Sequence, residues 1–78
     1  MVKLMDARIV NQDLIIDVKG LIISGSQDTE MIRTFRVLEL FQQGSQGIAR
    51  VKFFDGTIDI PLESMDYEVA QATWDTIP

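Results

Sequence analysis

The 78-residue chain is predicted to fold as one mainly β domain, a small five-stranded barrel or strongly bent meander with a short C-terminal helix. Three observations favour this fold. Short runs rich in Val, Ile, Leu and Phe recur along the chain, and clusters of turn-forming residues separate them. Two consecutive hairpins can also be paired so that their apolar side chains share one face. The length suits a single domain spanning residues 1–78.

The strongest local pattern is the hairpin around Asp55-Gly56, because Asp-Gly between β-formers favours a two-residue turn. This turn places apolar residues on one side of the ribbon and makes Lys52 face Asp59 on the other. A four-residue loop at 44–47 would pair the preceding strand so that Glu39 also faces Lys52. A one-residue slip would expose the apolar side, so the agreement of the two hairpins is informative. The predicted strands of this meander are 36–42, 48–54 and 57–63.

Two further strands are expected near the N-terminus. Apolar side chains alternate over residues 5–9, and the polar residues 11–13 can turn the chain into a second strand. The apolar face of this second strand is expected to run from Leu14 to Ile22. Gly20 is expected to bend the strand so that it pairs on both sides.

Two segments have helical features. Apolar residues such as Phe35 and Leu38 recur at nearly helical spacing, which gives an alternative α+β fold with a helix at about 29–43. The pairing with 48–54 favours a strand there instead. Residues 64–74 lack strand alternation and carry acidic residues near their start, so they are expected to form the short C-terminal helix.

The stretch VKFFDGTIDIPL, residues 51–62, resembles the last hairpin of SH3-like and Tudor-like small barrels. In those domains a Val-x-Phe-x-Asp-Gly turn leads into a strand that ends near Pro-Leu. The resemblance covers this hairpin alone. It implies an SH3-like barrel and a binding module without catalysis. Tudor-like domains bind methylated side chains in an aromatic cage. The aromatic residues of this chain cannot be assigned to the positions of such a cage.

The composition argues against enzymatic chemistry. The chain has no His and no Cys, so it lacks the commonest general base, the thiol nucleophile, disulfides and the usual zinc ligands. Pairs of acids such as Asp55 with Asp59, or Glu63 with Asp66, are better explained as turn-forming and solvating residues. We therefore expect no enzyme activity, no metal and no cofactor.

The charge is divided unevenly along the chain. Residues 1–54 carry a net charge of +1, whereas residues 55–78 carry six acids and no base, which gives −5 overall. The acidic end either keeps a small protein soluble or presents an acidic surface, for which the candidates are Asp66, Glu68 and Asp75. No signal peptide or membrane-length apolar run is recognised, so we expect a soluble cytoplasmic protein with no membrane partner.

The expected function is a non-enzymatic protein–protein interaction module, self-associating, that acts as a small subunit, adaptor or inhibitor of a larger assembly. Arg and aromatic residues are typical interface anchors. A nucleic-acid-related role is the alternative, either as a single-strand binder through Arg33, Arg36 and Arg50 or as an acidic mimic, but the acidic charge makes nucleic acid the less favoured partner. Trp74 could anchor a partner or plug the core. The candidate partner-binding residues are Val37, Phe41, Arg50, Phe54 and Trp74.

Overall fold

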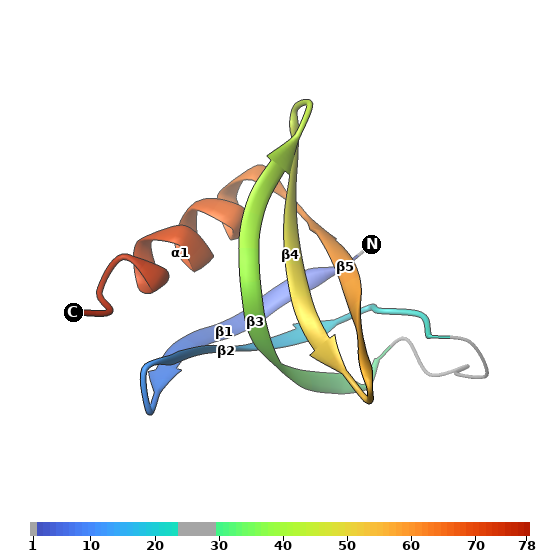
Figure 1. The fold of residues 1–78 in the computed structure, drawn as a ribbon. Coiled ribbons are helices and arrows are strands. Elements are labelled where there is room, and N and C mark those ends of the chain that lie inside the picture. Colours follow the sequence, from blue (N-terminus) through green and yellow to red (C-terminus); the bar gives the residue numbers. More distant parts are fainter. Residues whose placement is uncertain (1, 24–29) are drawn as a thin grey trace.

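Five antiparallel strands follow one another along the chain and form one sheet in the order β1-β2-β3-β4-β5 (Figure 1). The computed structural model describes residues 2–23 and 30–78. The mainly β fold with a C-terminal helix is confirmed, and the helical alternative for 29–43 is wrong because most of that segment is strand. The elements are β1 Lys3–Val10, β2 Asp13–Lys19, β3 Ile32–Gln43, β4 Gln46–Phe53, β5 Gly56–Leu62 and α1 Ser64–Trp74.

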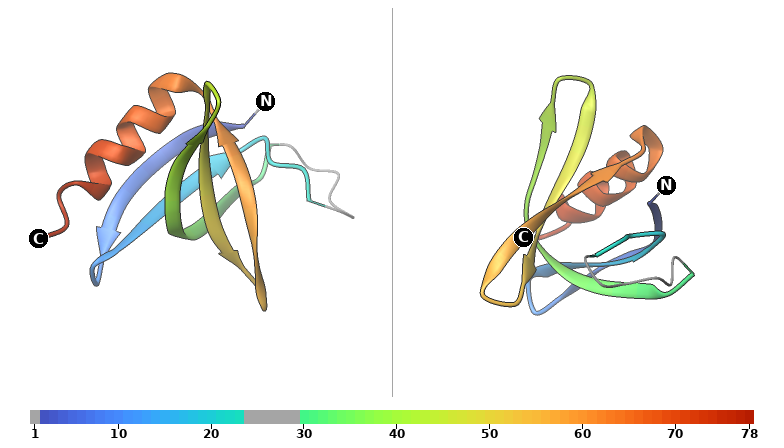
Figure 2. Two further views of the ribbon diagram at one scale, coloured as in Figure 1. Left: turned by 45° about the horizontal axis from the view of Figure 1, so that its top comes forward. Right: turned by 90° about the vertical axis from the view of Figure 1, so that its right-hand side faces the viewer.

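The sheet is strongly bent, so that one face encloses the core and the other faces outward (Figure 2). The strand order makes β1 and β5 the two edge strands of an open sheet. The helix α1 follows β5 and packs against β1, β2 and β4 at one end of the sheet. The core cluster of buried side chains consists of Leu14, Ile16, Val18, Phe35, Val37, Ala49, Val51, Ile60, Leu62 and Ala70.

The β1–β2 hairpin closes through a two-residue turn, as Asn11 and Gln12 both have positive φ, 51° and 69°. Asn tolerates this left-handed conformation better than most residues. The predicted apolar face of β2 is correct from Leu14 to Val18. It does not extend to Ile22, because β2 ends at Lys19 and Ile22 is 71% exposed.

In both C-terminal hairpins the two strands pair two residues out of the predicted register. Phe54 and Asp55 form the β4–β5 turn, with Phe54 at φ 52°, so Gly56 begins β5 rather than completing the turn. A two-residue turn at Gly44 and Ser45 replaces the expected four-residue loop, and Gly44 adopts the left-handed φ of 65° that this turn requires. Because the shift is an even number of residues, the predicted faces of β4 and β5 are kept.

One face assignment on β3 is wrong. The pairing of β3 with β4 shifts between Val37 and Glu39, so Leu38 is the extra residue of a β-bulge. The bulge interrupts the simple alternation of side chains. As a result Val37 lies in the core at 3% exposed, whereas Leu38, expected on the inner face, is 40% exposed.

The helix α1 is held close to the sheet by the absence of a side chain at Gly47 on β4. A Cβ atom at this position would lie 2.5 to 2.8 Å from ring and Cβ carbons of Tyr67. Ala70 is fully buried, and Trp74 is partly buried against the core cluster. The predicted helix at 64–74 is confirmed.

Candidate interaction surface

A row of charged side chains crosses the outer face of β3, β4 and β5. Arg50 donates from Nε and Nη2 to the two carboxylate oxygens of Asp59, at 2.8 and 3.1 Å, and from Nη1 to Glu39 at 3.4 Å. This guanidinium lowers the pKa of the Asp59 carboxyl, and hydrogen bonding to Asp59 raises the pKa of Arg50. The predicted cation between two acids therefore exists, but Arg50 takes the place assigned to Lys52. The two-point contact suits the planar guanidinium.

An apolar row lies next to this charged row on the same face. Phe41, Ile48 and Pro61 stand opposite one another on β3, β4 and β5. They share the face of Arg50, since side chains two residues apart on a strand point the same way. The Arg50 guanidinium lies 4.9 Å from the centre of the Phe41 ring, a cation–π contact. Arg50 thus contacts the apolar row through Phe41 and the acidic side chains through Asp59 and Glu39.

Phe54 stands at the tip of the β4–β5 hairpin and exposes 83% of its surface. Its ring contacts the ring of Phe53 edge-on at 4.6 Å between centres, and Phe53 in turn lies 6.5 Å from Phe35. The left-handed backbone costs a non-glycine residue on the order of 1 kcal/mol. A large aromatic residue in this conformation, mostly in solvent, points to a role outside the fold.

The structure separates the five predicted partner-binding residues. Phe41 on β3 and Arg50 on β4 contact each other, whereas Phe54 lies in the β4–β5 turn, four residues along the chain from Arg50. Val37 is buried in the core, so its assignment to a surface strip is wrong. Trp74 packs partly buried against the core cluster, which agrees with the alternative role as a core plug.

The arginines proposed for nucleic-acid binding do not form one surface. Arg33 pairs with Val18 and therefore lies on the core-side face of β3, whereas Arg36 pairs with Ile15 on the opposite face. Arg50 is engaged by carboxylates on either side. A single-strand binding face would need these cations side by side.

The acidic candidates of the C-terminal segment are also divided. Asp66 accepts a hydrogen bond from the backbone N–H of Leu4 at 3.1 Å. Glu68, two residues later in α1, projects about 200° around the helix axis from Asp66. Asp75 follows the helix and accepts a hydrogen bond from Gln71 Nε2 at 3.1 Å. Asp66 therefore ties α1 to β1, a role that the sequence pattern did not indicate.

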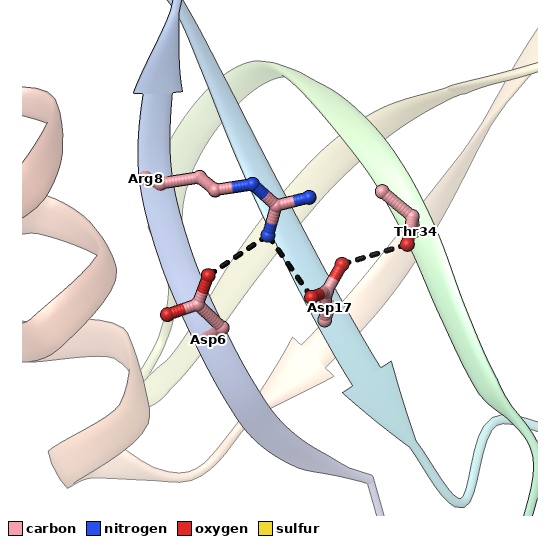
Figure 3. A network of polar contacts seen from close by, with 4 residues as sticks. All are labelled: Asp6, Arg8, Asp17 and Thr34. Carbon is pink, nitrogen blue, oxygen red and sulfur yellow. Dashed lines mark hydrogen bonds and ion pairs between the residues drawn. The ribbon is translucent and has the colours of Figure 1, made fainter.

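A second polar network, missed by the sequence analysis, lies on β1, β2 and β3 (Figure 3). Arg8 donates to Asp6 at 2.8 Å and to Asp17 at 2.9 Å, while the Thr34 hydroxyl donates to the other oxygen of Asp17 at 2.7 Å. The Thr34 hydrogen bond, followed by that of Arg8, lowers the pKa of Asp17. A register for the β1–β2 hairpin, derived from the turn at 11–12, would have brought Arg8 close to Asp17.

The described residues hold no group of three or more acidic side chains arranged to bind a metal ion, and none of their helices could span a membrane. No family model matches the chain, and no curated protein or solved structure matches it significantly.

Proposed function

We propose that this protein is a non-enzymatic protein–protein interaction module that self-associates and serves as a small subunit, adaptor or inhibitor of a larger assembly. The observation that carries the proposal is the exposure of Phe54, 83% at a left-handed turn position. An Asn or Gly would suit this backbone better. A phenylalanine at this position is explained by a contact with another molecule.

The surface around the hairpin has the composition of an interface. Phe41, Arg50 and the exposed Leu38 lie along β3 and β4, and Phe54 extends beyond the end of β4. Aromatic residues and arginine contribute much of the binding energy in protein interfaces. The resemblance of residues 51–62 to the last hairpin of SH3-like binding domains supports a binding role for the same segment. Association would also add stability to a chain of this size that has no disulfides.

Photo-crosslinking tests this function. A photoreactive phenylalanine analogue at position 54, introduced in native cells, should give discrete adducts with a second copy or with a larger subunit. The matched control is position 12, because Gln12 also occupies an exposed two-residue turn at positive φ. Position 12 should give no discrete adduct.

Phe54→Asn separates a binding role from a structural one. It relieves the left-handed strain and removes the contact with Phe53, two effects of about 1 kcal/mol that oppose each other. We expect its free energy of unfolding to stay within about 1 kcal/mol of the wild type, while assembly is lost in sedimentation experiments. Gln12→Gly also relieves a left-handed backbone, so it should not lower the free energy of unfolding, and it should leave assembly unchanged. A strongly destabilised Phe54→Asn variant that still assembles would show that Phe54 serves the fold.

A further inference from the structure

The outer edge of β5 has no neighbouring strand in the part of the chain that the structure describes (Figure 2). Its backbone groups can be assigned to the two edges from the ladder alone. Phe53 and Gly56 close a two-residue turn, and Pro61 has no N–H to give to β4. Hydrogen-bonded and non-bonded pairs alternate in an antiparallel ladder. The N–H and C=O groups of Thr57 and Asp59 therefore point away from β4.

The other edge of the sheet is protected along the first part of β1. The register of β1 shifts between Leu4 and Asp6, which marks a bulge, and the Leu4 N–H is taken by Asp66 of α1. Bulges and covering elements are the means by which proteins prevent further strand pairing. At β5 the corresponding protection lies only at Pro61, which has no N–H to offer on the outer edge. Residues 57–59 remain available.

An apolar groove of about 380 Å³ adjoins this edge. It runs from Pro61 and Leu62 of β5 to Val2 and Ile22 near the N-terminal strands, and Ile22 is 71% exposed. Ile58, on the core side of β5, is only partly buried. A strand added beside β5 would direct every second side chain toward Ile58 and the groove. These positions call for apolar side chains.

The charge around β5 indicates which side chains the added strand should carry at its other positions, those that point away from Ile58 and the groove. The hairpin and the residue after β5 carry Asp55, Asp59 and Glu63, and the whole segment 55–78 has no base. Asp59 already pairs with Arg50, but pairing of β5 with its own copy would also bring together Asp55 and Glu63, which form no ion pair within the described residues. An incoming strand with basic residues on its outward side would instead complement them.

We propose that β5 binds an extended segment of a partner protein by strand addition, and that this segment alternates apolar and basic residues. The inference rests on the proposed interaction function and names the chemistry of the partner. Main-chain hydrogen bonds to Thr57 and Asp59 give the affinity, and the groove and the acids select the sequence.

An acetylated decapeptide of alternating Lys and Val tests the proposal, with the same peptide carrying Glu for every Lys as its control. Amide hydrogen exchange followed by NMR should slow at Thr57 and Asp59 when the Lys peptide is added. Exchange at Ile60, whose N–H already faces β4, should not change. The Glu peptide should bind at least about tenfold more weakly.

Thr57→Pro should weaken binding of the Lys peptide about tenfold, because it removes an outward-pointing N–H donor without breaking the β4–β5 ladder. Thr57→Val keeps the donor and should bind like the wild type. If Thr57→Pro does not fold, the exchange measurement on the wild-type protein still decides. Absent binding, equal binding of the Glu peptide, or binding without slower exchange at Thr57 and Asp59 would overturn the inference. Adducts from position 54 would leave the interaction function standing in each of these cases.

Discussion

The β1–β2 and β4–β5 hairpins have the same parts. Each has a two-residue turn, an arginine paired across the strands with an aspartate, and buried aliphatic side chains on its core face. They differ at the turn and at the outer edge. Asn11 and Gln12 form the first turn, whereas the exposed Phe54 begins the second. In the first hairpin α1 packs against β1 and accepts the Leu4 N–H, whereas no strand of the described residues lies beside the outer edge of β5. One end of the sheet thus carries the helix, and the other is the end at which we propose that a partner binds.

The largest effect is expected from Gly47→Ala. The added methyl group would meet the Tyr67 side chain at 2.5 to 2.8 Å, so α1 must move away from β4. Overpacking of this kind costs about 1–3 kcal/mol of unfolding free energy, which urea denaturation would measure. Because α1 protects β1, exchange at the Leu4 amide should also become faster.

Gly56→Ala is the matched control on the β5 side. Nothing lies within 4 Å of its added Cβ, and its φ is not in the left-handed range. We expect no loss of stability, or a gain of a few tenths of a kcal/mol from the less flexible unfolded chain. Equal destabilisation by both substitutions would show that the close contact between Tyr67 and Gly47 is not the cause of the loss.

A smaller effect is expected from Asp66→Ala, which removes the carboxylate that accepts the Leu4 N–H. Loss of a partly exposed hydrogen bond to a charged group should cost about 1 kcal/mol in thermal or urea unfolding. Glu68→Ala, on an exposed position of α1, should stay within about 0.5 kcal/mol of the wild type. If the two variants are indistinguishable, the Asp66 contact does not fasten α1 to the edge.

The smallest difference concerns acid sensitivity. Both Asp17 and Asp59 have a folded-state pKa below the ordinary value of 3.8, so each stabilises the fold above that pH. This contribution disappears as the pH falls through the lowered pKa values and the carboxylates are protonated. Asp17 is 22% exposed and Asp59 43%, so Asp17→Asn should flatten the acid side of the stability curve more than Asp59→Asn. The reverse order in unfolding experiments between pH 2 and pH 6 would show that the Arg50 row is the stronger of the two.

Periodicity and turn residues predicted the five-strand meander, the helix at 64–74 and the faces of β4 and β5 from sequence. They did not predict the register, because Asp55-Gly56 favours a turn one residue later than the observed turn at Phe54 and Asp55, and this difference shifts the pairing of β4 with β5 by two residues. The observed register forms the two-point contact between Arg50 and Asp59.

The bulge at Leu38 could not be predicted either, because no local sequence pattern marks it. It places Val37 on the buried face and Leu38 on the exposed face, the reverse of the expected arrangement. The Leu4–Asp66 contact joins residues 62 positions apart in the sequence. It depends on how α1 packs against β1, which alternation within a strand does not describe. Of the predicted surface strip, Phe41, Arg50 and Phe54 therefore remain candidates, whereas Val37 is buried.

The most direct test of the contrast between the two edges is amide hydrogen exchange in dilute, unliganded wild-type protein. We expect the Leu4 amide to exchange slowly, and Thr57 and Asp59 to exchange much faster than their neighbours Ile58 and Ile60. Slow exchange along the whole of β5, or rapid exchange at Leu4, would show that the two edges do not differ as described.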